Sequence, residues 1–514
     1  MPEWLWKLLL AAVIVQIPFE TRDEWLGLSN LQWTFAALAV ASIPVLFKKR
    51  KTLAHDRLVQ AAAVFVTIQW AMALIAPEFH MNAIKAAIRF TAGFALLAII
   101  RASSSEKFVT KMWVLMGSLA AVYALVDYAG LGFSGLFRAG EFYIGQVRRS
   151  SGSFEYPNTA AAYFAMSLPI VWWSSFRLLL RFVSAFFLWA ALVLTFSKGA
   201  LVAVSLVIVW VGLKQRKRAA LLLGIGILAY GILLPLNPYF AEWIYGPVAL
   251  NPVAAEYRTP WNDLLEQPGQ MDAVPLTIHN IGISTWRSSG LWRDSIGYRW
   301  WDMDKESFTP TMPVVTQLPR DIARGEAVEV SAAFRTPDAP GRYLLVFELF
   351  SHNFDWFSST KGVIPMLIRT EIRPDIERRT QVSDISALYR RGQQPAVLTA
   401  KVPRESLWMA ALKIFESHPF GIGPDNYRLE YGKYLGATRW DTRVYSNNLY
   451  LELLTGSGIL GLVAFVVMLC VRAWRSNAAS LGAGVFLFHG VVDVFLMATP
   501  IYFAFWMFLG MEDQ

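Results

Sequence analysis

The sequence is poor in the residues on which soluble and metal-binding proteins depend. Charged residues make up 17% of its 514 residues, whereas a soluble chain carries about 25%. It has one cysteine, Cys470, so an intrachain disulfide and a cysteine-based metal site are both excluded. It also lacks a glycine-rich nucleotide loop, a Walker pattern and a histidine cluster with metal-ligand spacing. These features exclude a disordered or purely soluble chain, and we expect neither a metal nor another cofactor.

Apolar and aromatic residues are abundant instead. Hydrophobic residues make up 55% of the chain and its mean hydropathy is +0.39. The 21 Trp, 18 Tyr and 34 Phe fit aromatic belts at the two membrane–water interfaces. Because a span must cross about 30 Å of hydrocarbon, we expect about twelve transmembrane helices. The apolar runs lie near 4–19, 31–47, 58–76, 83–100, 109–129, 159–174, 182–197, 199–213, 219–235, 448–471, 479–497 and 498–510. The first run has no small-residue cleavage site after it, so we interpret it as a retained span.

Basic residues predict the orientation of these spans. Clusters at 48–51, 177–181, 214–218 and 472–475 follow the second, sixth, eighth and tenth runs, and alternating spans bring all of them to one side. By the positive-inside rule that side is the cytoplasm. Both termini are then cytoplasmic, and the segment 236–447 is extracytoplasmic. The net charge of +9 is therefore attributed to cytoplasmic loops and anionic membrane lipids rather than to nucleic acid.

The long outer segment changes character between about 272 and 373. Runs at 274–279, 295–301, 327–334, 342–350 and 363–372 alternate between apolar and polar residues and are separated by turn signals, which predicts a β-sandwich. The pattern loosely resembles immunoglobulin-like or fibronectin-like modules. The tryptophans of this region could stack on sugars, but in such modules they are more often core residues. They are Trp286, Trp292, Trp300, Trp301 and Trp356.

The chain thus divides into five predicted parts. Nine transmembrane helices occupy 1–236, a linker follows at 237–271, and the β-sandwich covers 272–373. A loop with amphipathic helices, one of them over 406–415, occupies 374–447, and three further transmembrane helices occupy 448–514.

Five cations are expected on the outer face, where positive charge is uncommon. Lys85 and Arg89 lie four residues apart on one helix face, Arg148 and Arg149 precede the sixth span, and Lys198 lies at the turn between the seventh and eighth. An anionic ligand such as a diphosphate would explain them, because arginine binds phosphate with two hydrogen bonds and lysine as a point charge. The alternative is that the long basic side chains reach the headgroup zone.

A second pair of polar residues falls within an apolar run. His489 and Asp493 in the eleventh run are also four apart. We expect a structural polar pair in preference to a proton relay, because one short pair does not make a path.

Four motifs, in order along the chain, resemble one known family. They are RRSSGSFEYPNTA at 148–160, LTFSKGA at 194–200, SHPFGIGPDNY at 417–427 and SNNLYLELLTGSGILG at 446–461. They are similar to the R-x-S-G-T-F…P-N, T-x-S-R-G, H-P-x-x-G-x-G-x-x-N-F and H-N-x-Y-L…G-x-x-G elements of the O-antigen ligase and polymerase family of bacterial membrane glycosyltransferases. The resemblance covers roughly 140–212 and 405–465 and leaves out the predicted sandwich.

This resemblance implies a GT-C-like fold and an O-antigen ligase-like activity in the bacterial inner membrane, with the large loop in the periplasm. The enzyme would move a glycan from undecaprenyl diphosphate to lipid A core or another glycan or lipid acceptor, with inversion and without a metal. Alternatives within the family are a polysaccharide polymerase and a protein O-oligosaccharyltransferase. A transporter of lipid-linked sugars and a non-catalytic scaffold belong to other classes. Lys198 falls where the family has arginine.

The catalytic candidates come from the last two motifs. Ligases carry histidine immediately before the asparagine that matches Asn448, whereas this chain has Asn447, which cannot take a proton. That difference favours a polymerase or another acceptor. His418, Asp425 and Glu452 are possible substitutes, although His418 could cap the preceding helix, Asp425 could order its turn, and Glu452 is more often a contact inside its helix.

Overall fold

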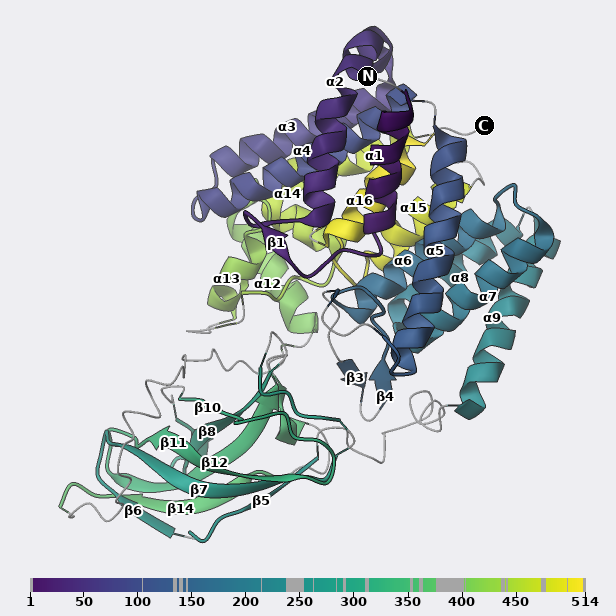
Figure 1. Ribbon diagram of the computed structural model, residues 1–514. Helices are drawn as coiled ribbons and strands as arrows, with labels where there is room; N and C mark the ends of the chain where they lie inside the picture. Colours follow the sequence, from purple (N-terminus) through teal and green to yellow (C-terminus); the bar gives the residue numbers. More distant parts are fainter. Residues whose placement is uncertain are drawn as a thin grey trace.

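The computed structural model describes most of the chain. The described residues are 3–103, 105–132, 136–137, 142–144, 147–213, 215–236, 254–261, 263–282, 284–289, 293–309, 314–351, 355–359, 364–375, 402, 404–435, 440, 442–472, 478–496 and 498–511. The helical domain and a β-rich domain are separate in space, with the β domain below the helices in the view of Figure 1.

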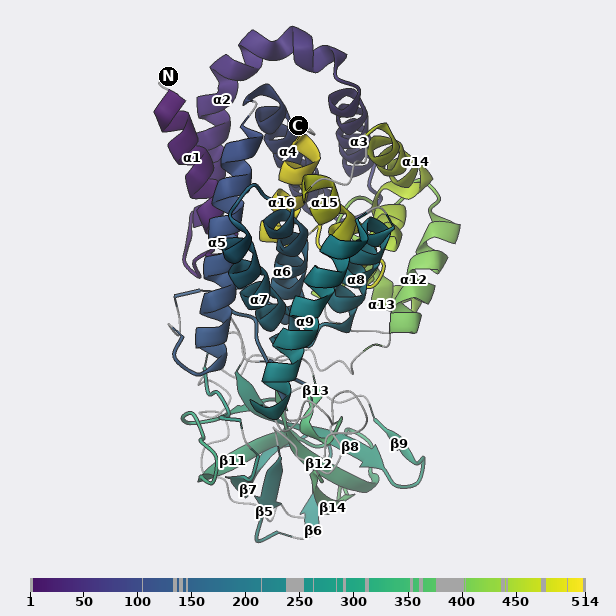
Figure 2. The ribbon, with the colours of Figure 1, turned by 90° about the vertical axis from the view of Figure 1, so that its right-hand side faces the viewer.

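Twelve apolar helices in the described part of the chain share one buried hydrophobic core, and each coincides with one of the apolar runs. Figures 1 and 2 show them as one bundle in which α6 and α16 lie near the centre. Nearly all of α6 is buried, consistent with that central position. They are α1 (Glu3–Gln16), α2 (Asn30–His55), α3 (Arg57–Leu74), α4 (His80–Ser103), α5 (Glu106–Tyr128), α6 (Pro157–Trp172), α7 (Leu178–Leu194), α8 (Lys198–Gly212), α9 (Arg216–Leu236), α14 (Leu449–Val471), α15 (Ala478–His489) and α16 (Thr499–Gly510).

Five of these helices, α2, α3, α4, α5 and α14, are long and apolar enough to cross a membrane. Shorter apolar helices accompany them, among them α1, α7, α8, α15 and α16. The chain is therefore a polytopic helical membrane protein.

Short polar side chains set several helix ends. Ser29 caps α2 and forms a reciprocal capping box with Gln32. Asp56 ends α2 and begins α3, because its carboxylate accepts hydrogen bonds from the N–H groups of Leu58 and Val59. Asn448 caps α14 in the same way. Each cap satisfies backbone donors that would otherwise lack a partner at the start of a helix.

The β domain contains two sheets that share one buried core. One has the strand order β10–β8–β12–β14–β6, with β9 and β13 at its side, and the other has the order β11–β7–β5. All five predicted strands are present, as β7, β8, β11, β12 and β14, and β5 and β6 come from residues that the sequence analysis places in a linker. The strands are β5 (Ala255–Arg258), β6 (Asp263–Glu266), β7 (Met271–Asn280), β8 (Asp294–Asp302), β9 (Ser307–Phe308), β10 (Thr316–Gln317), β11 (Ala327–Arg335), β12 (Gly341–Ser351), β13 (Asp355–Trp356) and β14 (Met366–Ile372), and a 3₁₀ turn, η1 (Phe357–Ser359), follows β13.

The tryptophans of this domain serve mainly its core. Trp286, Trp300 and Trp356 are buried, as expected for core residues, and Trp301 is half-buried. Trp292 lies outside the described residues.

Two short helices, α12 (Arg404–Ser417) and α13 (Tyr427–Tyr434), lie between the β domain and α14 in the chain. The predicted amphipathic helix over 406–415 lies within α12, whose apolar face packs on Tyr427 and Tyr431 of α13. Two small hairpins complete the described structure: β1 (Glu24–Trp25) with β2 (Leu28–Ser29), and β3 (Phe142–Ile144) with β4 (Val147–Arg149).

Candidate functional site

A cavity of about 710 Å³ lies where the ends of α1, α6, α14, α15 and α16 meet. Segments far apart in the sequence line it, including two of the four motif regions, 148–160 and 446–461. Its polar lining residues are Glu20, Gln32, Arg89, Arg149, Ser153, Glu155, Tyr156, Asn158, Thr159, Arg428, Arg443, Tyr445, Asn447, Asp493 and Thr499. Among these lining residues, four arginines stand against three carboxylates, and this excess of positive charge favours an anionic ligand.

Arg149 is held at two points in this wall. Its Nε donates to the carbonyl of Thr195 at 2.7 Å and its Nη2 donates to Oδ1 of Asn158 at 2.7 Å. Asn158 in turn donates through Nδ2 to Oδ2 of Asp493, also at 2.7 Å. Arg149 thus joins the start of α6 to the turn between α7 and α8, and Asn158 extends this link to the segment after α15.

Burial lowers the pKa of Arg149 to about 10, although the nearby Asp493 opposes this shift. The guanidinium therefore keeps its charge at neutral pH. A fixed cation of this kind needs no reorganisation when negative charge develops beside it.

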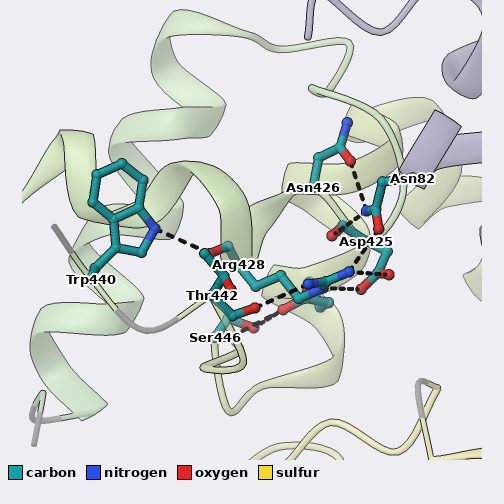
Figure 3. Close-up of polar contacts among 8 residues, drawn as sticks. Asn82, Asp425, Asn426, Arg428, Trp440, Thr442 and Ser446 are labelled. Atoms are coloured by element: carbon teal, nitrogen blue, oxygen red, sulfur yellow. Dashed lines mark hydrogen bonds and ion pairs between the residues drawn. The ribbon is translucent and has the colours of Figure 1, made fainter. Parts of the chain in front are cut away.

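Arg428 forms a second node of polar contacts, shown in Figure 3. Its guanidinium donates to both carboxylate oxygens of Asp425 at 3.0 and 3.2 Å, to Oδ1 of Asn82 at 2.6 Å and to the carbonyl of Thr442 at 3.0 Å. Asn82, in the first turn of α4, also donates to the carbonyl of Asp425 and to the side chain of Asn426. Burial opposes the charge of Arg428, but the hydrogen bonds and attraction from Asp425 outweigh burial and raise the pKa of Arg428. This node fixes the segment around α13 against α4.

Of the five predicted cations, Arg89 and Arg149 line the cavity. Lys85 and Lys198 are exposed and are not among the lining residues. Lys198 is the first residue of α8, at the turn where the sequence analysis places it. The side chain of Arg148 lies outside the described part of the structure.

Of the predicted catalytic residues, Asn447 lines the cavity, with a left-handed backbone at φ +51°. Asn448 instead caps α14 and donates from Nδ2 to the carbonyl of Val491 at 2.9 Å. That bond ties the start of α14 to the connection between α15 and α16, which supplies Asp493 to the same cavity. Asn448 therefore positions two walls of the site.

The proposed substitutes for the missing histidine lie away from the lining. His418 follows the last turn of α12, where its Nδ1 lies 3.1 Å from the hydroxyl of Ser417 and 3.3 Å from that of Tyr434. Asp425 has a left-handed backbone at φ +66° and binds Arg428. Glu452 is buried and accepts hydrogen bonds from the N–H and hydroxyl of Ser446, which precedes the start of α14.

The expected pair of His489 and Asp493 is wrong. Helix α15 ends at His489, so Asp493 lies in the following turns and not one helical turn further along. Asp493 accepts the hydrogen bond from Asn158 instead, and the ring of His489 packs against Phe495, with centroids 4.6 Å apart.

Several lining residues escaped the sequence analysis. Arg428, Arg443 and Tyr445 lie in the polar segment before α14, where such residues attract no notice. Glu155 and Asn158 fall within the first motif, so their place in that motif was a usable signal. Burial raises the pKa of Tyr445, with a further contribution from the nearby Asp425, so this hydroxyl stays protonated at neutral pH.

The glycines of the last two motifs hold the site together through their backbones. Helix α14 is broken at Gly458, which has φ +64° and ψ −168°. The N–H of Gly423 donates to the carbonyl of Gly456, and the N–H of Ile459 donates to the carbonyl of Pro419. A Cβ at Gly421 or at Gly458 would come within 2.6 Å of the opposite backbone. Only glycine permits the loop at 418–424 to pack this closely on the broken helix.

Comparison with known proteins agrees with the motifs. Residues 372–466 match the family model described as O-antigen ligase. A search of curated proteins found no match. The matched segment contains α12, α13, the loop packed on Gly458 and the cavity residues Arg428, Arg443 and Asn447. This match and the motifs described above support the assignment of the chain to the O-antigen ligase family.

Proposed function

We propose that this protein is a glycosyltransferase that takes a glycan from a polyprenyl diphosphate, with undecaprenyl diphosphate as the expected carrier. The observation that carries the proposal is the cavity lined by Arg89, Arg149, Arg428 and Arg443. Membership of the family supports ligase- or polymerase-type chemistry in general. The arginine cavity supports a diphosphate as the group that is held while the sugar is transferred.

We place the cavity on the periplasmic side of a bacterial inner membrane. The basic cluster at 48–51 lies at the C-terminal end of α2, and the lining residue Gln32 lies at its N-terminal end. The positive-inside rule assigns the basic end to the cytoplasm. In this topology all twelve apolar helices cross or enter the membrane, and the two-sheet β domain is a periplasmic β-sandwich inserted between α9 and α12.

The proposed reaction is a displacement at the anomeric carbon. The acceptor oxygen forms a bond to this carbon as the bond to the phosphate oxygen breaks, and the electron pair of the broken bond leaves on the diphosphate. Inversion follows from attack on the face opposite the leaving group. The acceptor hydroxyl loses its proton to a base, and the carboxylates of Glu20, Glu155 and Asp493 are the candidates that the cavity offers.

Asn447 bears on the choice of acceptor. It occupies the position of the ligase histidine and faces the cavity as an amide that does not titrate. This favours a polymerase, in which the acceptor is another lipid-linked glycan, as the second candidate beside ligation to lipid A core.

The test uses purified protein in lipid nanodiscs with an undecaprenyl-diphosphate oligosaccharide and a panel of acceptors. Release of the carrier diphosphate and the mass of the glycan product are measured together. Sugar on lipid A core indicates a ligase, longer lipid-linked chains indicate a polymerase, and sugar on a peptide indicates protein glycosylation. A folded sample that binds the donor but releases no carrier diphosphate with any acceptor contradicts the proposal. Activity that survives a metal chelator supports the metal-independent mechanism.

A matched pair of variants on α4 tests the cavity itself. Arg89 lines it, whereas Lys85, one turn earlier on the same helix, does not. We expect Arg89→Ala to lose most carrier release and Lys85→Ala to retain it. Equal effects of the two substitutions contradict the assignment of the donor site.

A further inference from the structure

The hairpin of β1 and β2 presents an apolar tip outside the core of the bundle. Trp25 pairs with Leu28, and Leu26 and Gly27 form the two-residue turn. The exposed fractions are 67% for Trp25, 76% for Leu26 and 37% for Leu28. One small turn therefore exposes three large apolar side chains to the surroundings of the protein.

The turn itself is unfavourable for the residue at its tip. Leu26 has φ +52° and Gly27 has φ +73°. A turn with two positive φ angles prefers asparagine, aspartate or glycine in its first central position. A leucine there is strained by its left-handed backbone and also exposes its side chain. A surface that takes up this side chain would account for both features.

The base of the hairpin is polar and fixed. The N–H of Thr21 donates to Oδ1 of Asn30 at 3.1 Å, and Ser29 exchanges hydrogen bonds with Gln32. The N–H of Arg22 donates to the carbonyl of Leu136. These bonds hold the tip in one orientation rather than leaving it as a loose loop.

The tip continues a lipid-facing stripe of α2. The exposed residues Val40, Ile43 and Phe47 recur at helical spacing on this candidate span, as expected for a face in contact with hydrocarbon. Trp33 lies at the N-terminal end of the same stripe. Its ring centroid is 5.0 Å from that of Trp25, and its indole N–H donates to the Trp25 carbonyl. The hairpin therefore adjoins the lipid-facing surface where tryptophan rings favour the membrane–water interface.

We propose that the Trp25–Leu28 hairpin inserts its tip into the interfacial zone of the bilayer and so fixes the mouth of the cavity at the membrane surface. Glu20 and Gln32, on the two sides of the hairpin, both line the cavity. A lipid-linked donor would therefore reach the arginines past this hairpin. The entry route rests on the proposed function, whereas the insertion of the tip does not.

The test is a measurement of accessibility in nanodiscs by spin-label power saturation. Cys470 is the only cysteine, so Cys470→Ser gives a background in which Leu26→Cys carries the sole label. Ile281→Cys, at a residue 53% exposed in the β domain, is the matched control. We expect the label at 26 to be accessible to oxygen, which dissolves in the bilayer, and shielded from a water-soluble nickel chelate. The label at 281 should show the reverse.

Two outcomes would overturn the proposal. A label at 26 as accessible to the nickel chelate as the label at 281 would show that the tip lies in water. A label at 26 shielded from both oxygen and nickel would show that protein covers it. For the entry route, Trp25→Ala with Leu26→Ser should raise KM for a long-chain lipid-linked donor and leave kcat unchanged. An unchanged KM rejects that route, even with the tip inserted.

Discussion

The break in α14 leads to a sharp prediction, because it requires a backbone that only glycine adopts. Gly458 has φ +64° and ψ −168°, a region essentially confined to glycine. A Cβ built there would lie 2.4 Å from the carbonyl carbon of Phe420 and 2.5 Å from the carbonyl oxygen of Pro419. Gly458→Ala must therefore move the loop at 418–424 or straighten the helix.

The cost follows from three contributions. The backbone strain is about 1–3 kcal/mol. Forcing a methyl group into this contact adds roughly 1–3 kcal/mol. Moving the loop also weakens the hydrogen bond from the N–H of Ile459 to the carbonyl of Pro419, which contributes about 1 kcal/mol. We expect Gly458→Ala to destabilise the protein by at least ~3 kcal/mol, taking the lower ends of these ranges.

The assay is the midpoint of thermal unfolding in one detergent, together with hydrogen exchange of peptides that cover 418–424. Gly224→Ala in α9 is the matched control, because a Cβ there meets no atom within 4 Å and the backbone is helical. Alanine at such a position is neutral or stabilising by up to about 1 kcal/mol. Equal midpoints and equal exchange for the two variants would refute the packing argument.

Three further predictions concern chemistry and pH. Arg149→Ala should lower the rate of carrier release by about 10²–10³-fold. Arg149→Lys should lower this rate by less, because lysine keeps the charge but loses one of the two hydrogen bonds of the arginine. An undiminished rate for the alanine variant would show that Arg149 does not belong to the site. Asn447→His should add an inflection at about pH 6.5 to the profile of kcat/KM, and an unchanged profile would show that position 447 does not meet the reacting groups. Hydrogen bonds, first from the N–H of Ser288, lower the pKa of Asp321 from its usual 3.8. The stability this gives the β domain is present above about pH 4 and is lost as pH falls through the lowered pKa. Asp321→Asn should therefore speed hydrogen exchange around Trp286 at neutral pH but not in strong acid, and a pH-independent difference would contradict the assignment.

The helices could be predicted because lipid-facing and buried positions are both apolar. Each apolar run contains one helix, and the caps at Ser29 and Asp56 act through side chains that the sequence displays. Hydropathy does not locate an end inside an apolar run, so the termination of α15 at His489 was missed. The strands β5 and β6 were missed because each has only four residues, too few for an alternating pattern.

The candidate site was only partly accessible to sequence reasoning. Arg89 and Arg149 stood out because cations near outer membrane ends are uncommon. Arg428, in α13, and Arg443 lie in a polar segment where arginine is ordinary, and only the fold brings them beside the other two. Lys85 shares a helix face with Arg89 but lies one turn closer to the N-terminus of α4 and does not line the cavity. The spacing of two residues does not show how far along a helix a cavity extends.

The backbone packing around Gly458 has a consequence for how relatives of this protein should be compared. The glycine contacts join main chain to main chain, so the fold requires them whichever sugar or acceptor is bound. The family match covers this scaffold and one wall of the cavity, whereas Arg89, Arg149, Glu155 and Asp493 come from segments outside it. We therefore expect selectivity for the glycan to reside in the walls that lie outside the match. Chimeras that exchange the residues outside 372–466 are the direct test of this expectation.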